Sequence, residues 1–291
     1  MDVAIIEPHG FCLGVRAAVE TARRMLSDGV PVWCLHELVH NATVVAELRE
    51  KGMRFVESLE DVPEQARVMI SAHGAPPEVL ERAVERRLQV TDATCPFVAR
   101  THRKVREFAA GGIPVVVVGN AGHVEVRGLV GECRIPSGVM VVQGVDDVAA
   151  LPFPEDAPVG VVCQTTLSSG AVHDALSALR ARYPRLVESA ASETCTATRD
   201  RQAAVVAFVC SARAGERIGV LVLGSANSSN TTRLADVARE AGAVVWRIDG
   251  PEELAVCNFT GIDRLGVTAG ASTPESAVQD VLDALKARSR R

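Results

Sequence analysis

Short runs of apolar, often β-branched residues alternate with amphipathic stretches along the whole chain. The clearest apolar runs, which predict strands, are Val30–Leu35, Val68–Ser71, Ile113–Val118, Val159–Cys163, Gly219–Leu223 and Leu265–Thr268. The amphipathic stretches, which predict helices, include Thr43–Lys51, Pro77–Leu88, Pro96–Ala109, Val172–Tyr183, Ala197–Val209 and Thr232–Ala241. Gly52, Gly111 and Gly242 stand where three of these helices should end. Such alternation is typical of parallel sheets covered by helices, so the pattern predicts an α/β fold.

Polar residues recur at matching spacings in three parts of the chain. Cys12, Cys95 and Cys195 each precede a helical stretch and lie 83 and 100 residues apart. His40 follows Cys12 by 28 residues, and His123 follows Cys95 by the same number. The matching stretch after Cys195 reaches the polar loop that runs from residue 225 to 230. The agreement in residue type as well as in spacing indicates an internal repeat.

Each repeat also contains a second polar loop after a predicted strand. These loops are Ser71–Gly74, Gln164–Thr166 and Ala269–Ser272. We interpret the pattern as three pseudo-symmetric αβα units, at residues 1–95, 96–194 and 195–291, with the strand at Val3–Ile6 completing the third. Ligands of α/β sheets bind beyond the carboxyl ends of the strands, so the loops of all three units could face a common centre.

The composition limits the function classes. Of the 291 residues, 47% are hydrophobic, which is enough for a sizeable core, and only 3% are aromatic. The net charge is −5, and few aromatics are present for base stacking, which argues against nucleic-acid or membrane-surface partners. The sequence shows no long apolar span and no signal peptide, so we expect a cytoplasmic location. In that compartment the eight cysteines should be thiols or metal ligands.

The three loop cysteines suit a metal centre. A helix N-terminus stabilises a thiolate, and three converging thiolates form a soft ligand set for zinc or an iron–sulfur cluster. The paired Cys-x-x-Cys spacing of structural zinc sites is absent. A cubane held by three cysteines leaves one iron open as a Lewis acid. The alternative is buried core thiols, which we expect for the other five cysteines, at positions 34, 133, 163, 210 and 257.

The remaining loop residues favour an anion. His40, His73 and His123 supply N–H donors, and the loop Asn227–Asn230 supplies hydroxyls and amides at a predicted helix start. Such a pocket suits a phosphate-like ligand, whereas a P-loop and a Gly-x-Gly-x-x-Gly motif are both absent. The other histidines, at positions 9, 36, 102 and 173, are interpreted as surface or packing residues.

Eight motifs together resemble the 4-hydroxy-3-methylbut-2-enyl diphosphate reductase family of the methylerythritol phosphate pathway. They occur in order over nearly the full chain and are Gly10–Val15, His36–Asn41, Ser71–Gly74, Asp92–Pro96, Gly122–Glu125, Gln164–Ser168, Gly224–Asn230 and Thr268–Ser272. The resemblance implies a cloverleaf of three αβα units around a central [4Fe–4S] cluster. It also implies an oxidoreductase that removes the allylic hydroxyl of the diphosphate substrate and releases isopentenyl or dimethylallyl diphosphate.

The resemblance assigns roles to individual residues. Cys12, Cys95 and Cys195 would hold the cluster, leaving one iron open for the substrate hydroxyl. Glu125 and Thr165 would deliver protons, with His123 beside them. The diphosphate would be bound by His40, His73, His123, Ser228, Ser229, Asn230 and Ser272. Electrons would come one at a time from an external donor of the ferredoxin or flavodoxin type.

Three positions depart from the usual family pattern. Thr196 stands where an aromatic residue is common, Val124 where a proline is common, and Leu129 where a threonine is common. None of them removes a predicted ligand or the predicted acid. From the residues alone, two other functions stay open: a redox-neutral lyase or dehydratase, and a non-catalytic iron–sulfur sensor. A lyase would need no reductant, and a sensor would need the cysteines but not Glu125.

Overall fold

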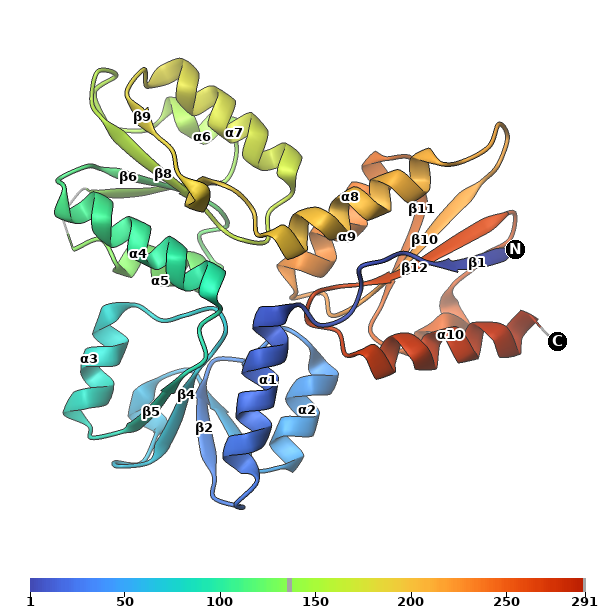
Figure 1. The fold of residues 1–291 in the computed structure, drawn as a ribbon, viewed down its shortest axis with the longest axis horizontal. Coiled ribbons are helices and arrows are strands. Elements are labelled where there is room, and N and C mark those ends of the chain that lie inside the picture. The colour runs from blue at the N-terminus through green and yellow to red at the C-terminus, as the bar shows by residue number, and fades with distance from the viewer. Residues whose placement is uncertain (135–137, 290–291) are drawn as a thin grey trace. The chain divides into compact units, whose positions relative to one another are not determined.

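Twelve strands form three four-stranded parallel sheets in the computed structural model, which describes residues 1–134 and 138–289 (Figure 1). The strands are β1 (Asp2–Ile5), β2 (Val32–Leu35), β3 (Met53–Val56), β4 (Arg67–Ile70), β5 (Gln89–Asp92), β6 (Val115–Val118), β7 (Val139–Val142), β8 (Val159–Cys163), β9 (Leu186–Val187), β10 (Ile218–Leu223), β11 (Val244–Ile248) and β12 (Arg264–Ala269). The predicted α/β fold with three αβα units is confirmed.

Ten α-helices and three 3-10 helices connect the strands in the described residues. They are α1 (Leu13–Leu26), α2 (Ala42–Glu50), η1 (Leu59–Asp61), α3 (Pro77–Glu85), α4 (Pro96–Ala110), α5 (Val124–Gly131), α6 (Val145–Ala149), α7 (Ser169–Arg182), η2 (Ala190–Ser192), α8 (Thr196–Cys210), α9 (Ser229–Glu240), η3 (Pro251–Val256) and α10 (Glu275–Ser289). None of the helices in this part of the chain has the length and apolar character needed to cross a bilayer.

The three sheets share one strand order. Two of them read β3-β2-β4-β5 and β7-β6-β8-β9, so the second strand of each lies at one edge and the first lies beside the third. The third sheet reads β11-β10-β12-β1, which is the same order with the N-terminal strand in the fourth position. Strand β1 pairs in parallel with β12, with Asp2 opposite Arg264.

The chain divides into two compact units. Unit 1 comprises residues 1–15, 40–46 and 196–291 and contains the sheet with β1. Unit 2 comprises residues 16–39 and 47–195 and contains the other two sheets. The threefold division at residues 95 and 195 follows the sequence repeat and stays a prediction.

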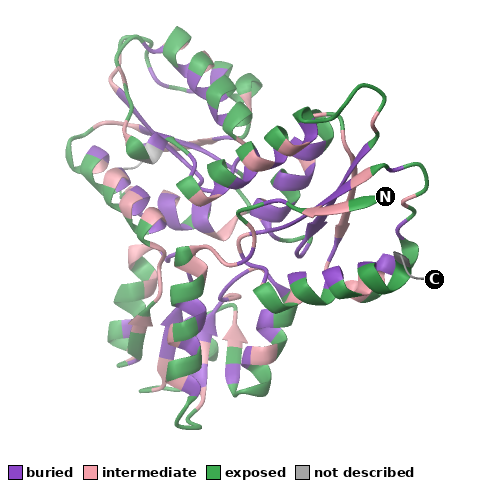
Figure 2. Ribbon diagram, turned by 45° about the vertical axis from the view of Figure 1, so that its right-hand side comes forward, coloured by how far each residue is buried: buried purple, intermediate pink, exposed green. Residues whose placement is uncertain are grey.

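The central strands are buried on both faces, as parallel sheets require (Figure 2). In strand β6, Val116 and Val118 point into the core formed with helices α6 and α7, whereas Val115 and Val117 point into the core formed with α4 and α5. In unit 1, helix α10 packs on one face of its sheet (Figure 1), and helices α8 and α9 pack on the other.

The predicted elements agree with the structure to within a few residues for all six strands and all six helices. Gly52 and Gly242 end helices with φ of +101° and +100°, as their positions predict. The third helix stop is displaced, because Gly111 has a φ of −81° and the left-handed conformation falls on Gly112, at +68°. The pattern did not single out the edge strands β3, β5, β7, β9 and β11, which are short and partly exposed.

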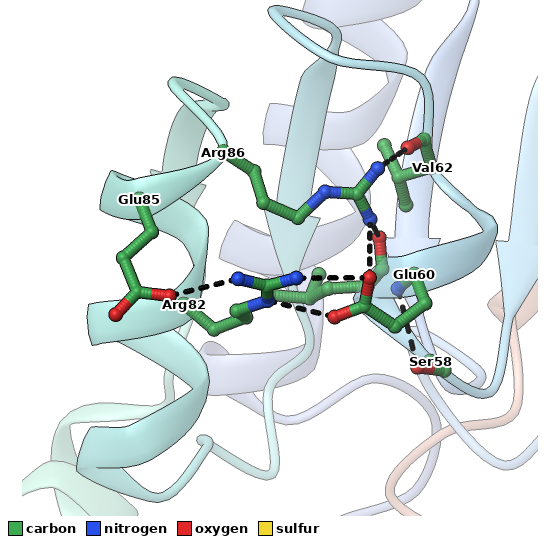
Figure 3. Close-up of polar contacts among 7 residues, drawn as sticks. Ser58, Glu60, Val62, Arg82, Glu85 and Arg86 are labelled. Carbon is green, nitrogen blue, oxygen red and sulfur yellow. Dashed lines mark hydrogen bonds and ion pairs between the residues drawn. The ribbon is translucent and has the colours of Figure 1, made fainter.

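Ion pairs of helix α3 fasten η1 in unit 2 (Figure 3). Arg82 donates from Nε to Glu60 at 2.7 Å and from a second nitrogen to Glu85 at 2.8 Å. Arg86 donates to the carbonyl oxygens of Leu59, the first residue of η1, and Val62, the residue that follows it. The Arg82 pairs are exposed and contribute little, whereas the half-buried Arg86 satisfies one carbonyl at each end of η1.

Candidate functional site

The predicted site residues follow the strands that lie at the centre of each sheet. In unit 2, His73 comes after β4, His123 and Glu125 come after β6, and Thr165 comes after β8. In unit 1, the residues at 228–230 come after β10 and Ser272 comes after β12. These are the first and third strands of each sheet, which lie side by side. The loops beyond them are therefore at the topological switch point, where α/β sheets bind ligands.

Glu125 and Thr165 meet in unit 2. Glu125 is 1% exposed, and its two carboxyl oxygens accept hydrogen bonds from the Thr165 backbone N–H at 2.8 Å and the Thr165 hydroxyl at 3.1 Å. Burial raises the pKa of Glu125 to about 7, although the two Thr165 hydrogen bonds and the charge of His102 act in the opposite direction. A carboxyl of this kind is largely protonated just below neutral pH and can act as an acid.

His73 and His123 are also neighbours in unit 2. Their rings meet edge to face, with centroids 5.8 Å apart. His123 caps helix α5, and its Nδ1 accepts a hydrogen bond from the Glu125 backbone N–H at 3.2 Å. Because Nδ1 accepts, Nε2 carries the proton of the neutral imidazole and is a donor. On the other ring, Nδ1 of His73 lies 3.3 Å from the Ser71 hydroxyl.

In unit 1, hydrogen bonds hold three polar loops together. Asn230 donates from Nδ2 to Thr198 at 3.0 Å and accepts from the Ala271 N–H at 2.9 Å. Ser272 donates its hydroxyl proton to the carbonyl of His40 at 2.9 Å. The structure therefore brings together His40, Asn230 and Ser272, and the Ser272 hydroxyl would have to rotate before it could donate to a ligand.

Helix α9 begins within the same cluster of unit 1. Ser228 is its N-cap and accepts from the Thr231 N–H at 3.3 Å, while half-buried Ser229 is the first residue of the helix. Gly270 is required here by close packing, because a Cβ atom would lie 2.1 Å from the Thr231 hydroxyl oxygen. The start of α9 thus offers backbone N–H groups and hydroxyls beside the 270–272 loop, a suitable environment for an anion.

Each of the three loop cysteines is held by the same kind of hydrogen bond. The backbone N–H of Cys12 donates to Ala271 at 3.1 Å, that of Cys95 donates to Ala72 at 3.0 Å, and that of Cys195 donates to Thr165 at 3.1 Å. All three acceptors lie in the loop after the third strand of a sheet. The bond therefore fastens each cysteine to the loop that carries His73, Thr165 or Ser272, and it lies within one compact unit each time.

The three cysteines have the chemistry of metal ligands. All are half-buried, outside any disulfide, and placed directly before helices α1, α4 and α8. In Cys12, the sulfur accepts a hydrogen bond from the Val15 N–H at 3.5 Å. Within the described residues, no group of three or more Cys, His, Asp or Glu side chains is placed to hold a metal ion. The ligand set stays a prediction, since Cys12 belongs to unit 1 and the other two cysteines belong to unit 2.

The other five cysteines are only partly as expected. Cys34, Cys163 and Cys257 are buried, and burial raises the pKa of Cys163 to about 12, so it is an inert thiol. The expectation was wrong for Cys210, which is exposed near the end of helix α8, and for Cys133, which is half-buried. Cys210 lies outside the buried face of α8, to which Val205 and Val209 belong, whereas Cys133 packs partly buried against the core formed with α4 and α5.

Sequence reasoning missed several residues that support the site. Ser71 contacts His73, and Gln164 accepts from the Asn120 N–H at 3.0 Å, which joins the loops after β8 and β6. His102 was interpreted as a surface or packing residue; it is a buried packing residue, 5% exposed, and its pair with Glu132 at 2.7 Å was not predicted. The available signal for His102 was its position on the buried face of α4, the helix whose N-cap is Cys95.

Comparisons with known proteins agree with this geometry. Residues 3–286 match the family described as LytB protein. The chain is 43% identical over 292 residues to 4-hydroxy-3-methylbut-2-enyl diphosphate reductase 2 of Mycobacterium bovis, covering 98% of this chain and 86% of the relative. It is 41% identical over 289 residues to the reductase of Burkholderia pseudomallei, covering 99% and 90%.

A solved structure also matches nearly the whole chain. It is the E-1-hydroxy-2-methyl-but-2-enyl-4-diphosphate reductase from Plasmodium falciparum, at a TM-score of 0.91 and 31% sequence identity. The match covers 98% of this chain and 88% of the Plasmodium chain.

Proposed function

Since the chain belongs to the LytB family of 4-hydroxy-3-methylbut-2-enyl diphosphate reductases, we propose that it catalyses that reduction at the loops described above. The substrate is (E)-4-hydroxy-3-methylbut-2-enyl diphosphate, and the products are isopentenyl and dimethylallyl diphosphate. The reaction breaks the allylic C–O bond, takes up two electrons and two protons, and releases one water molecule. It is the terminal step of the non-mevalonate isoprenoid pathway, and we place it in the cytoplasm.

The observation that carries the proposal is the buried contact between Glu125 and Thr165. Hydroxide is a poor leaving group, so an acid must protonate the departing oxygen. Glu125 is buried and has a pKa of about 7, so about half of it holds a proton at neutral pH. The Thr165 hydroxyl touches this carboxyl and can pass the proton on while it remains hydrogen-bonded.

Cys12, Cys95 and Cys195 would hold a [4Fe–4S] cluster. When bound, the cluster would supply the electrons one at a time and an open iron that polarises the substrate hydroxyl. The donor set fits this group, because three cysteines outside any disulfide stand at helix N-termini, which stabilise thiolates. An external donor of the ferredoxin or flavodoxin class would deliver the electrons.

The diphosphate would be bound by neutral donors rather than by lysines. In unit 2 these are His73 and His123, the latter with an Nε2–H donor. In unit 1 they are His40, Ser228, Ser229, Asn230 and Ser272, together with N–H groups at the start of α9. Histidines, hydroxyls and helix N-termini bind phosphate oxygens by charge-assisted hydrogen bonds.

The test is anaerobic reconstitution with iron and sulfide, followed by turnover of the allylic diphosphate with a chemical one-electron donor. We expect a brown protein with about four iron and four sulfide per chain. Glu125→Gln should keep the cluster but abolish turnover, whereas Glu107→Gln, at an exposed carboxyl, should behave as the wild type. Full turnover without a reductant would indicate a lyase. A colourless, zinc-loaded and fully active protein would contradict the proposal.

A further inference from the structure

A buried polar network lies beside the Glu125 helix in unit 2. Nδ1 of His102, on helix α4, lies 2.7 Å from Glu132 Oε1, and Arg106 donates to the same oxygen at 2.6 Å. His102 and Glu132 are 5% and 6% exposed. Burial alone would raise the pKa of Glu132, but the hydrogen bonds from His102 and Arg106 outweigh it and lower that pKa. The ionised carboxylate therefore fixes the orientation of the imidazole.

The opposite edge of the His102 ring contacts two glycines. A Cβ atom on Gly74 would lie 2.8 Å from Nε2, and one on Gly128 would lie 3.0 Å from Cε1 and 3.2 Å from Nε2. Nε2 has no hydrogen-bond partner among the described residues. This edge of the His102 ring therefore makes van der Waals contact only, with no hydrogen bond to the part of the chain that the structure describes. The ring lies between the backbone at Gly74 and the backbone at Gly128, where neither residue has a side chain.

These two segments carry the residues proposed to act on the substrate. Gly74 follows His73 directly and adopts a φ of +77°, which suits glycine. Gly128 lies three residues after Glu125 on helix α5, whose N-cap is His123. The His102 edge thus separates the loop of His73 from the helix that carries Glu125. The rings of His73 and His123, one from each segment, have their centroids 5.8 Å apart.

We propose that His102 is a positioning residue for the acid and the two histidines: oriented by Glu132, its ring edge sets the spacing between the Gly74 loop and the Gly128 turn of helix α5. The inference rests on the proposed function for its catalytic consequence. The ring suits this role because its edge lies against the backbone of a glycine in each of the two segments. A displacement of about 1 Å at reacting groups can lower a rate by up to about 100-fold.

The experiment uses the cluster-loaded protein and His102→Asn, which keeps an N–H donor for Glu132 but lacks the ring edge that faces the glycines. We expect normal iron content and a fold close to that of the wild type, with kcat at least about tenfold lower. Gly128→Ala adds a methyl group against the ring and should also lower kcat. In the double variant the methyl group occupies the vacated space, so kcat should partly recover.

Two results would overturn the proposal. One is a fully loaded His102→Asn protein with wild-type kcat and KM. The other is strict additivity, in which the double variant is as impaired as the product of the two single changes predicts. The first result holds also when the melting temperature of His102→Asn is lower, because an unchanged kcat would then show a structural role alone.

A readout that is independent of turnover separates this inference from the proposed function. The C=O stretch of the protonated Glu125 carboxyl can be titrated by infrared difference spectroscopy, with Glu125→Gln as the blank. Loss of the His102 charge would by itself shift the midpoint in His102→Asn. The result that reports the spacing is a return toward the wild-type midpoint in the double variant, which restores no charge; a midpoint that does not return would contradict the proposal. If the wild type shows no reductase turnover, the proposed function fails, and this titration still decides the role of His102.

Discussion

The buried carboxyl of Glu125 links the stability of the protein to its chemistry. Sequence motifs identify this residue, but they do not reveal that it is 1% exposed or that Thr165 provides both of its hydrogen bonds. Burial opposes ionisation, and the two hydrogen bonds are too few to reverse that effect. The same environment that keeps the acid protonated for catalysis should therefore destabilise the fold when the proton is lost.

Glu125→Gln should become more stable relative to the wild type as the pH rises. The pKa of Glu125 is about 7 in the fold, against an ordinary 4.5, so the protonated form is favoured by folding. Its stabilising contribution is complete below pH 4.5 and is lost as the pH rises through 7. The difference amounts to about 3 kcal/mol, and glutamine does not titrate.

Melting temperatures of equally loaded proteins between pH 5 and 8.5 measure this difference. The control is Glu107→Gln, whose difference from the wild type should stay small throughout, because Glu107 is exposed. A difference between Glu125→Gln and the wild type that does not change with pH would show that the Glu125 carboxyl is not kept protonated by the fold.

Single residues were predictable from the sequence where their chemistry is rare. Cys12, Cys95 and Cys195 stood out because thiols before helices are unusual, and the structure places each of them there. His102 did not stand out, because its role depends on Gly74 and Gly128, which approach it only in the folded chain. A contact between residues so far apart in sequence leaves no local pattern.

At the scale of the helix, two serine caps of the same geometry allow stability and function to be separated. Ser228 accepts from the Thr231 N–H at 3.3 Å, and Ser168 accepts from the Ala171 N–H at 3.2 Å. Replacing either serine with alanine should destabilise the protein by about 1 kcal/mol. Only Ser228→Ala should also raise KM for the diphosphate. Equal KM values in both variants would remove Ser228 from the substrate site.

A second contact between elements recurs in two sheets. Gly160 on β8 faces Phe108 of α4, and Gly266 on β12 faces Phe208 of α8. A Cβ atom at either glycine would lie 2.5 Å from the ring. Helices α4 and α8 each follow a predicted cluster ligand. In each of them a phenylalanine packs directly on the third strand of a sheet, and this contact sets the distance between the helix and the sheet.

Gly160→Ala and Gly266→Ala should each destabilise the protein by about 1–3 kcal/mol, because the ring must move. Gly170→Ala is the control: Gly170 lies in helix α7, and apart from its chain neighbours and the backbone of its own helix no atom of the described chain lies within 4 Å of the place that a Cβ atom would take. This substitution should be neutral or stabilising. Thermal unfolding of the three variants measures the effect. A stable Gly160→Ala protein would mean that the helix can withdraw from the sheet without loss.

Elements at the centre of a sheet were easier to predict than those at its edge. Strand β6 is four consecutive valines, all buried, and its pattern has no competing interpretation. Strand β5, Gln89–Asp92, is mostly exposed and mixes polar with apolar residues. Its strand conformation comes from hydrogen bonds to β4, which depend on the tertiary fold and not on local propensity.

At the scale of the whole molecule, the repeat seen in the sequence corresponds to one strand order used three times. Each sheet ends in a fourth strand that leads to a cysteine, and β1 is that strand for the sheet of unit 1. The two spacings between the cysteines, 83 and 100 residues, differ because the connections between strands vary in length. The backbone hydrogen bond from each cysteine to the loop after the third strand is the same in all three sheets. The sequence spacing therefore predicted that the three cysteines occupy equivalent positions, and the shared backbone hydrogen bond explains why they do.

Because the three cysteines occupy equivalent positions, we expect each of them to be equally important for binding the cluster. Cys12→Ser, Cys95→Ser and Cys195→Ser should each fold, because serine is a good helix cap and the bonds to Ala271, Ala72 and Thr165 come from the backbone. Each variant should nevertheless lose the brown colour and most of its iron after anaerobic reconstitution, since a hydroxyl does not replace a thiolate ligand. Cys210→Ser, at an exposed thiol, is the control that should load fully. Normal loading of any one of the three variants would show that its cysteine serves the fold and not the cluster.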